Sequence, residues 1–220
     1  MKKVNFKLIP AFTMLELVFA IVIIGILAAI LIPRMQTSRM QEAADQIVSH
    51  IRYTQHLAMQ DDKFNPNNEL WFREQWRIMF ESNDNTNNEQ AYSIFGDLDD
   101  DGFADIEEVA RNPQDTNKIL SGGSAGNIVF GVTNTITQDL NIGSRYGIAA
   151  IVFNGGCAAA DGVIAFDYMG RPLVGNVNDD ATPYPVGRLM TARCQIVLTN
   201  DAGEIRTIQI EPETGYASLI

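Results

Sequence analysis

Carboxylates are concentrated in one short stretch of the chain, residues 97–108. The residues in question are Asp97, Asp99, Asp101, Asp105 and Glu108, with Gly102 and Phe103 between them. Acids at alternate positions around a glycine that permits a sharp turn can direct several hard oxygen atoms to one point. Such a set suits a divalent cation, because so many like charges in twelve residues repel one another without one. The alternative is an acidic loop that is simply solvated.

The order of these residues resembles the EF-hand type of calcium loop at every ligand position. The resemblance implies side-chain ligands from Asp97, Asp99 and Asp101, and a backbone carbonyl ligand from Phe103. It also implies that Asp105 binds directly or through water, and that Glu108 contributes two oxygens. We therefore predict calcium as the cofactor. Residues 92–95 before the loop are strand-like and only a short helix over 106–111 is expected after it, which favours a structural clamp over a sensor.

Two cysteines, Cys157 and Cys194, lie in the last third of the chain. An even cysteine count in a protein outside the cytosol predicts one disulfide between them. Two unrelated buried thiols are the alternative.

No arrangement of residues in the sequence indicates catalysis, and we predict that the protein is not an enzyme. His50 and His56 are six residues apart on a predicted helix, so they lie on different faces and form no metal pair. A glycine-rich phosphate loop, a Gly-x-Ser-x-Gly elbow and a Cys-x-x-Cys pair are all missing from the sequence. The net charge of -11 argues against a nucleic-acid partner, which requires clustered Lys and Arg.

The N-terminus sets the predicted compartment. Residues 1–11 hold three lysines and no acid, and residues 12–33 are apolar apart from Thr13 and Glu16. A helix of this length spans roughly 30 Å, which is one bilayer core. The lysines predict that residues 1–11 stay in the cytoplasm and that the rest of the chain is exported. A secretory signal peptide is one alternative, but the apolar run is long for it and residues 27–29 form a poor cleavage site. A plain signal anchor fits the length but does not explain Glu16, whose charge costs about 2 to 3 kcal/mol in an apolar helix.

The run from Ala11 to Glu16 resembles the processing signal of type IV prepilins. The resemblance implies cleavage between Ala11 and Phe12 by a prepilin peptidase, followed by N-methylation of Phe12. It implies that Glu16 pairs with the new α-amine of a neighbouring subunit, and that the helix bends or partly melts between Gly25 and Pro33 in a filament. The family usually has Gly before the cut, where this chain has Ala11.

The rest of the 220-residue chain is organised around that helix. We predict a leader at 1–11, a transmembrane and assembly helix at 12–33, its periplasmic half at 34–60, and a globular β-rich head at 61–220 with the calcium loop. Alternating and apolar runs predict strands at 76–80, 92–95, 128–132, 148–153, 163–167, 194–198 and 205–210, with a hairpin turn at 200–203. The predicted fold class is α+β and pilin-like, with a long N-terminal helix packed on an antiparallel sheet.

Two C-terminal segments, 163–172 and 205–216, resemble the GspH/FimT group of minor pseudopilins and minor pilins, although Tyr216 stands where a basic residue is common. The combined expectation is a non-catalytic structural subunit of a type II secretion pseudopilus or a type IV pilus. Other pilin-like subunits are its expected partners, and its expected location is the bacterial inner membrane with the head in the periplasm or in an extracellular filament. The alternative is a membrane-tethered calcium-binding or hydrolytic domain that uses a pilin-type signal.

Overall fold

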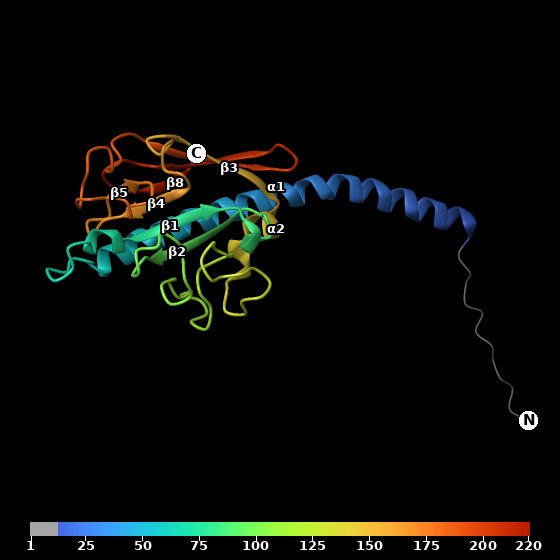
Figure 1. Cartoon of the computed structure of the whole chain (residues 1–220). Coiled ribbons are helices and arrows are strands. Elements are labelled where there is room, and N and C mark those ends of the chain that lie inside the picture. Colours follow the sequence, from blue (N-terminus) through green and yellow to red (C-terminus); the bar gives the residue numbers. More distant parts are fainter. Residues whose placement is uncertain (1–12) are drawn as a thin grey trace, which may run out of the picture. The chain divides into compact units, whose positions relative to one another are not determined.

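Helix α1 begins at Met14 and ends at Gln60 (Figure 1). The computed structural model describes the backbone of residues 13–220 and the side chains of residues 13–28 and 39–220. The chain divides between Ser38 and Arg39 into two units. The second unit, residues 39–220, is called the head below.

Within the head, α1 has one apolar stripe. Its buried side chains recur at spacings of three and four residues, which places them on one face of the helix. They are Met40, Ala43, Ala44, Ile47, Val48, Ile51 and Ala58. After Gln60 the helix stops at an acidic turn that contains Asp61 and Asp62.

The head contains two four-stranded antiparallel sheets. The first has the order β2-β1-β4-β5 and consists of β1 (Trp76–Glu81), β2 (Ala91–Gly96), β4 (Val163–Phe166) and β5 (Pro172–Val174). The second has the order β3-β6-β7-β8 and consists of β3 (Ile148–Gly155), β6 (Cys194–Asn200), β7 (Ile205–Ile210) and β8 (Ala217–Leu219). Figure 1 shows β1 and β2 alongside the part of α1 that belongs to the head.

The core is continuous between the helix and both sheets. Residues of the α1 stripe, of β1 and β2, and of β6 and β7 belong to one cluster of buried apolar side chains. Burial alternates along β6, as expected for a strand with one covered face. In contrast, all six residues of β2 are buried, because the chain after β2 folds back over this edge.

The segment between β2 and β3 contains little regular structure. Short antiparallel bridges, Phe95 with Val109 and Ser93 with Ser121, attach it to the edge of β2. Its only helices among the described residues are a 3-10 turn at Gln138–Leu140 and α2 (Ile142–Tyr146). Two further 3-10 turns, Trp71–Glu74 and Asp84–Thr86, flank β1.

The predicted fold class, with a long N-terminal helix packed on an antiparallel sheet, is corrected by the structure. The helical part that belongs to the head is residues 39–60, about 22 residues, and the head is mostly β with more than one sheet. The physical reason is which of the helix's apolar side chains are buried. Side chains from Met14 to Leu27 remain exposed rather than packed on a sheet, whereas the stripe from Met40 onward contributes to a core that both sheets share.

The predicted transmembrane helix at 12–33 lies partly outside the described residues. In the portion of the chain that the structure describes, the helices do not reach the combined length and apolar character that crossing a membrane requires.

Most predicted strands in the head are confirmed, with two local corrections and two omissions. Residues 128–132 form turns instead of a strand: Gly131 has φ +77°, and the N–H groups of Val132 and Thr133 both bond to the carbonyl of Val129. The short helix expected over 106–111 is absent, because Val109 and Arg111 make bridges instead. Strands β5 and β8 were missed, since three residues carry too little periodicity to be recognised.

Candidate metal centre

The acidic loop follows directly on the buried strand β2, and its first residue fixes its shape. Asp97 is fully buried, and its Oδ1 accepts the N–H of Asp100 at 2.8 Å. Its Oδ2 accepts the N–H of Gly102 at 2.9 Å. Gly102 has φ +87°, and a Cβ there would lie 2.8 Å from Nδ2 of Asn176, so this turn requires glycine.

The other carboxylates of the loop also bond to nearby backbone N–H groups. Asp99 Oδ1 accepts from Asp101, and Asp101 Oδ1 accepts from Phe103, at 3.3 and 2.8 Å. At the far end, Glu108 Oε1 accepts the N–H groups of Leu98 and Asp99 at 2.6 and 3.2 Å. Glu108 therefore connects the end of the loop to its beginning.

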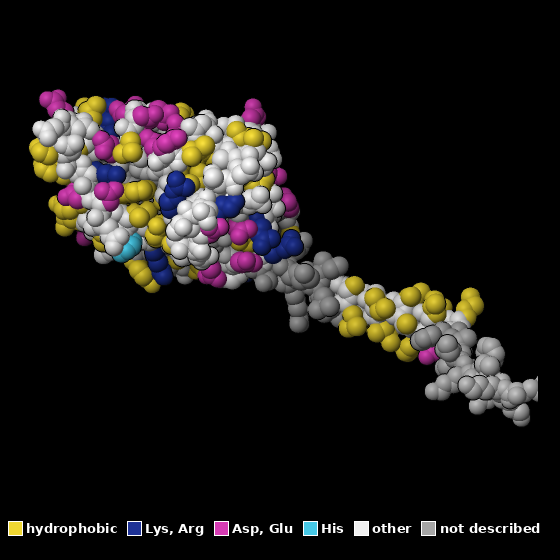
Figure 2. Space-filling view, turned by 90° about the horizontal axis from the view of Figure 1, so that it is seen from below, with side chains coloured by type: hydrophobic (Ala, Val, Ile, Leu, Met, Phe, Trp, Pro, Cys, Tyr) yellow, Lys and Arg dark blue, Asp and Glu magenta, His cyan; other side chains and the backbone are white. Residues whose placement is uncertain are grey.

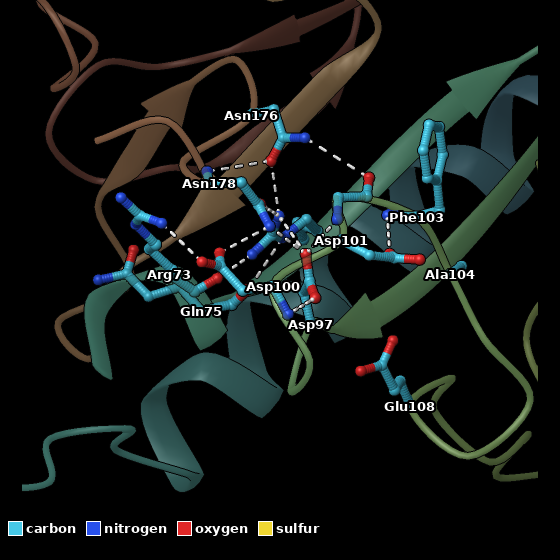
Figure 3. A network of polar contacts seen from close by, with 12 residues as sticks. Arg73, Gln75, Asp97, Asp100, Asp101, Phe103, Ala104, Glu108, Asn176 and Asn178 are labelled. Atoms are coloured by element: carbon cyan, nitrogen blue, oxygen red, sulfur yellow. Dashed lines mark hydrogen bonds and ion pairs between the residues drawn. The ribbon is translucent and has the colours of Figure 1, made fainter. Parts of the chain in front are cut away.

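All five carboxylates that the sequence predicts as ligands are brought together. Oxygens of Asp97, Asp99 and Glu108 lie within 4.8 Å of one another, and so do oxygens of Asp99, Asp101 and Asp105. Because Asp99 belongs to both groups, the two groups form one continuous acidic centre. The predicted carbonyl ligand, Phe103, lies in the same turn (Figure 3).

One oxygen in this centre has no partner. Glu108 Oε2 is buried and accepts no hydrogen bond from the described residues, and Glu108 as a whole retains 8% of its accessible surface. A buried carboxylate oxygen without a donor is costly unless a cation satisfies it. The residues present therefore fit a divalent cation.

Electrostatics in the loop point in the same direction. Burial raises the pKa of Glu108, and the nearby carboxylates of Asp97 and Asp99 raise it further, against the lowering effect of the two backbone hydrogen bonds. Burial also raises the pKa of Asp105, with Asp101 and Asp99 acting in the same sense. The negative charges of these carboxylates repel one another. A set of several hard oxygen donors is also the kind of ligand set that calcium prefers.

The structure adds a buried cation that the sequence did not reveal. Arg77 on β1 is fully buried, and its guanidinium lies 3.4 Å from Asp97 Oδ2. It also donates to Oδ1 of Asn176 at 2.7 Å, to Oδ1 of Asn178, and to the carbonyl of Arg73. Burial lowers the pKa of Arg77 to about 10, an effect that Asp97 and Glu108 partly offset, so the side chain remains charged at neutral pH.

Asn178 is the second residue that sequence reasoning missed. Its Nδ2 donates to Asp97 Oδ2 at 2.5 Å and to Asp100 Oδ1 at 2.9 Å. Figure 3 shows Asn176 and Asn178 on a separate segment of the chain that faces the acidic loop. No local sequence pattern indicates this role, because Asn178 and Asp97 are 81 residues apart.

The predicted disulfide is confirmed. Cys157 and Cys194 are bonded, and their Cα atoms are 4.9 Å apart. Both residues are fully buried, and the bridge links the turn after β3 to the first residue of β6.

The predicted assembly residues are only partly described. Glu16 is exposed in the first turn of α1, and its N–H donates to Oγ1 of Thr13 at 3.2 Å. Gly25 is helical with open space around it. Ala11 and Phe12, together with the side chain of Pro33, lie outside the described residues. Cleavage, methylation and helix melting in a filament therefore stay predictions.

The two histidines occupy different environments. His50 lines a groove, and its Nδ1 lies 2.6 Å from the hydroxyl of Tyr92, while His56 is exposed. Burial lowers the pKa of His50 to about 4, so it is neutral at pH 7. Neither histidine belongs to a metal-ligating cluster of the described residues.

Comparison of the chain with protein-family models, with curated proteins and with solved structures found no match.

Proposed function

We propose that the protein is a non-catalytic structural subunit, a minor pseudopilin or minor pilin, of a type II secretion or type IV pilus filament. The observation that carries the proposal is the surface of α1 between Met14 and Leu27. Every large apolar side chain described there is between 44% and 87% exposed. Figure 2 shows this part of the helix covered by hydrophobic side chains on the face in view.

A helix of this kind requires an apolar environment. Eleven large apolar side chains are exposed along it, and burying each one yields roughly 1 to 2 kcal/mol at its present exposure. The gross gain is on the order of 10 to 20 kcal/mol, before the entropy of association is subtracted. Packing against the corresponding helices of other subunits supplies such an environment. In this proposal the inner membrane holds residues 12–33 before assembly, and the head lies in the periplasm or in an extracellular filament.

Glu16 gives the packing a register. Among residues 13–28 it is the only charged side chain, and burying its carboxylate without a partner is unfavourable. The proposed partner is the α-amine of Phe12 on a neighbouring subunit, which exists only after cleavage behind Ala11. A subunit that is out of register leaves both charges unpaired, so the pair selects one axial offset.

Calcium is the proposed cofactor of the head, with Asp97, Asp99, Asp101, Asp105, Glu108 and the carbonyl of Phe103 as its ligands. The unpartnered oxygen of Glu108 is the observation that supports it. A bound ion supplies positive charge to this centre, while the chain's own backbone N–H groups orient the carboxylates. We assign it a structural role, because β2 and a bridge rather than two helices flank the loop.

Replacement of Glu16 tests the assembly role. In cells that form the filament, Glu16→Gln is expected to leave the amount of head in the membrane fraction unchanged and to reduce its recovery in sheared filaments at least tenfold. Glu42→Gln is the matched control, since Glu42 is an exposed acid on the same helix within the head. Normal incorporation of the Glu16→Gln protein would remove the register role, and a tethered calcium-binding domain would become the better account.

A further inference from the structure

We propose that Arg77 and Asn178 are positioning residues of the cation site and that, through them, a bound cation orders the segment 175–183. This inference rests on the proposed cation site. It adds a second segment of the chain to that site, one which lies outside the twelve-residue loop.

Asn178 contacts the loop at two of its acidic residues. One amide group donates to both Asp97 and Asp100, at 2.5 and 2.9 Å. The same side chain accepts from Arg77 through its Oδ1. Since Asp97 is the first predicted ligand, Asn178 and Arg77 both hold a carboxylate that the cation site would use.

Arg77 contacts both the acidic loop and the segment that holds Asn176 and Asn178. Its guanidinium reaches Asp97 on one side and Asn176 on the other, and its Nε donates to the carbonyl of Gln75 at 3.2 Å. Because Arg77 has no exposed surface, its charge is compensated by protein groups rather than by solvent, and Asp97 is its ion-pair partner. A change in the position of Asp97 must therefore move Arg77 and, with it, the acceptors on Asn176 and Asn178.

A parallel connection runs through Asp100 and Asp180. Arg73 donates to Asp100 Oδ2 at 2.6 Å and to the carbonyl of Asp180 at 3.0 Å. Arg188 then forms an ion pair with the carboxylate of Asp180. The segment from 175 to 180 is thus attached to the acidic loop at both ends by charged groups.

The loop's charge makes these attachments dependent on a cation. Seven of the twelve residues from Asp97 to Glu108 are acidic, and Arg77 is the only fully buried positive charge among the described residues. Repulsion between the carboxylates displaces Asp97 and Asp100 when no ion is bound, which weakens the acceptors that Asn178 uses. A bound cation fixes the carboxylate of Asp97 and, through its Oδ1, the backbone N–H of Asp100. The effect should fade beyond residue 183, because Tyr184 has its own attachment to Arg171.

Hydrogen exchange and calcium titration test the inference on the full chain. With calcium chloride in place of EDTA, amide exchange of residues 175–183 in the wild-type protein is expected to slow at least tenfold. Asn178→Ala is expected to weaken calcium binding about 10-fold or more, as is usual for loss of a residue that orients a metal ligand. Asn117→Ala is the matched control, because Asn117 is exposed and, among the described residues, its side chain is hydrogen-bonded only to Asp115.

The possible results separate this inference from the cation site itself. Wild-type calcium affinity in Asn178→Ala, or unchanged exchange of residues 175–183 in a wild-type protein that does bind calcium, would overturn the inference and leave the cation site intact. Absence of calcium binding by the wild-type protein would overturn both. The wild-type exchange comparison needs no variant, so it decides the matter even if Asn178→Ala does not fold.

Discussion

Replacement of Glu108 by glutamine should stabilise the head in the absence of calcium and remove most of its stabilisation by calcium. Gln keeps the shape of the side chain and an oxygen that can accept the N–H groups of Leu98 and Asp99. It removes the charge that Asp97 and Asp99 repel and the buried oxygen that has no partner. In EDTA, the free energy of unfolding of Glu108→Gln is expected to rise by about 1 kcal/mol.

Calcium should reduce or remove this difference. For a site with a dissociation constant of about 0.1 to 1 mM, 5 mM calcium stabilises the wild-type protein by about 1 to 2 kcal/mol. For a chain of this size, that raises the melting temperature by roughly 2 to 8 °C. Glu108→Gln loses one ligand charge and its second ligand oxygen, so calcium should raise its melting temperature by less than about 1 °C.

Thermal unfolding in EDTA and in 5 mM calcium measures both effects. Glu107→Gln is the control, because Glu107 is the exposed neighbour of Glu108 and has no predicted ligand role. Its calcium response should equal that of the wild-type protein. An undiminished calcium response in Glu108→Gln would refute the assignment of Glu108 as a ligand, and lower stability of this variant in EDTA would refute the argument from repulsion.

Two further predictions concern the rest of the head. Because burial lowers the pKa of His50 to about 4, the unfolded chain takes up a proton between pH 6.5 and pH 4 that the folded chain does not. The free energy of unfolding therefore falls by roughly 1 to 3 kcal/mol as the pH falls through this range. Urea unfolding at pH 4.5 and pH 7 should show a smaller difference between the two pH values for His50→Gln than for the wild-type protein. An equal difference in the two proteins would contradict the role of His50. Replacing Cys157 and Cys194 together by serine should lower the free energy of unfolding by about 3 to 4 kcal/mol, since the disulfide joins positions 37 apart in sequence. A loss below about 1 kcal/mol in denaturant titrations would show that the bridge constrains the unfolded chain much less than its loop length implies.

The acidic loop could be recognised from the sequence because its information is local. Ligand types, the turn at Gly102 and the closing Glu108 all lie within twelve residues, and their order alone predicts convergence. The residues that support the loop could not be recognised in this way, because they are distant from it in the sequence. Arg77 and Asn178 lie 20 and 81 residues from Asp97, and nothing near either one in sequence indicates that they meet there.

The errors in the predicted fold have a similar cause. Strands such as β1 and β6 were predictable because their apolar runs are long enough to show a period. The distribution of strands over two sheets depends on long-range pairing, for example Arg77 of β1 with Ala165 of β4. Similarly, the apolar run at 128–132 has strand composition, but Gly131 and the bonds to the Val129 carbonyl turn the chain there.

Mass spectrometry of the N-terminal peptide from native membranes would decide whether this protein is a processed filament subunit. The peptide of a processed subunit is expected to begin at Phe12 and to carry one added methyl group on its α-amine. A chain that begins at Met1, or one that is cut after the apolar helix, would show that the protein is not processed as a prepilin.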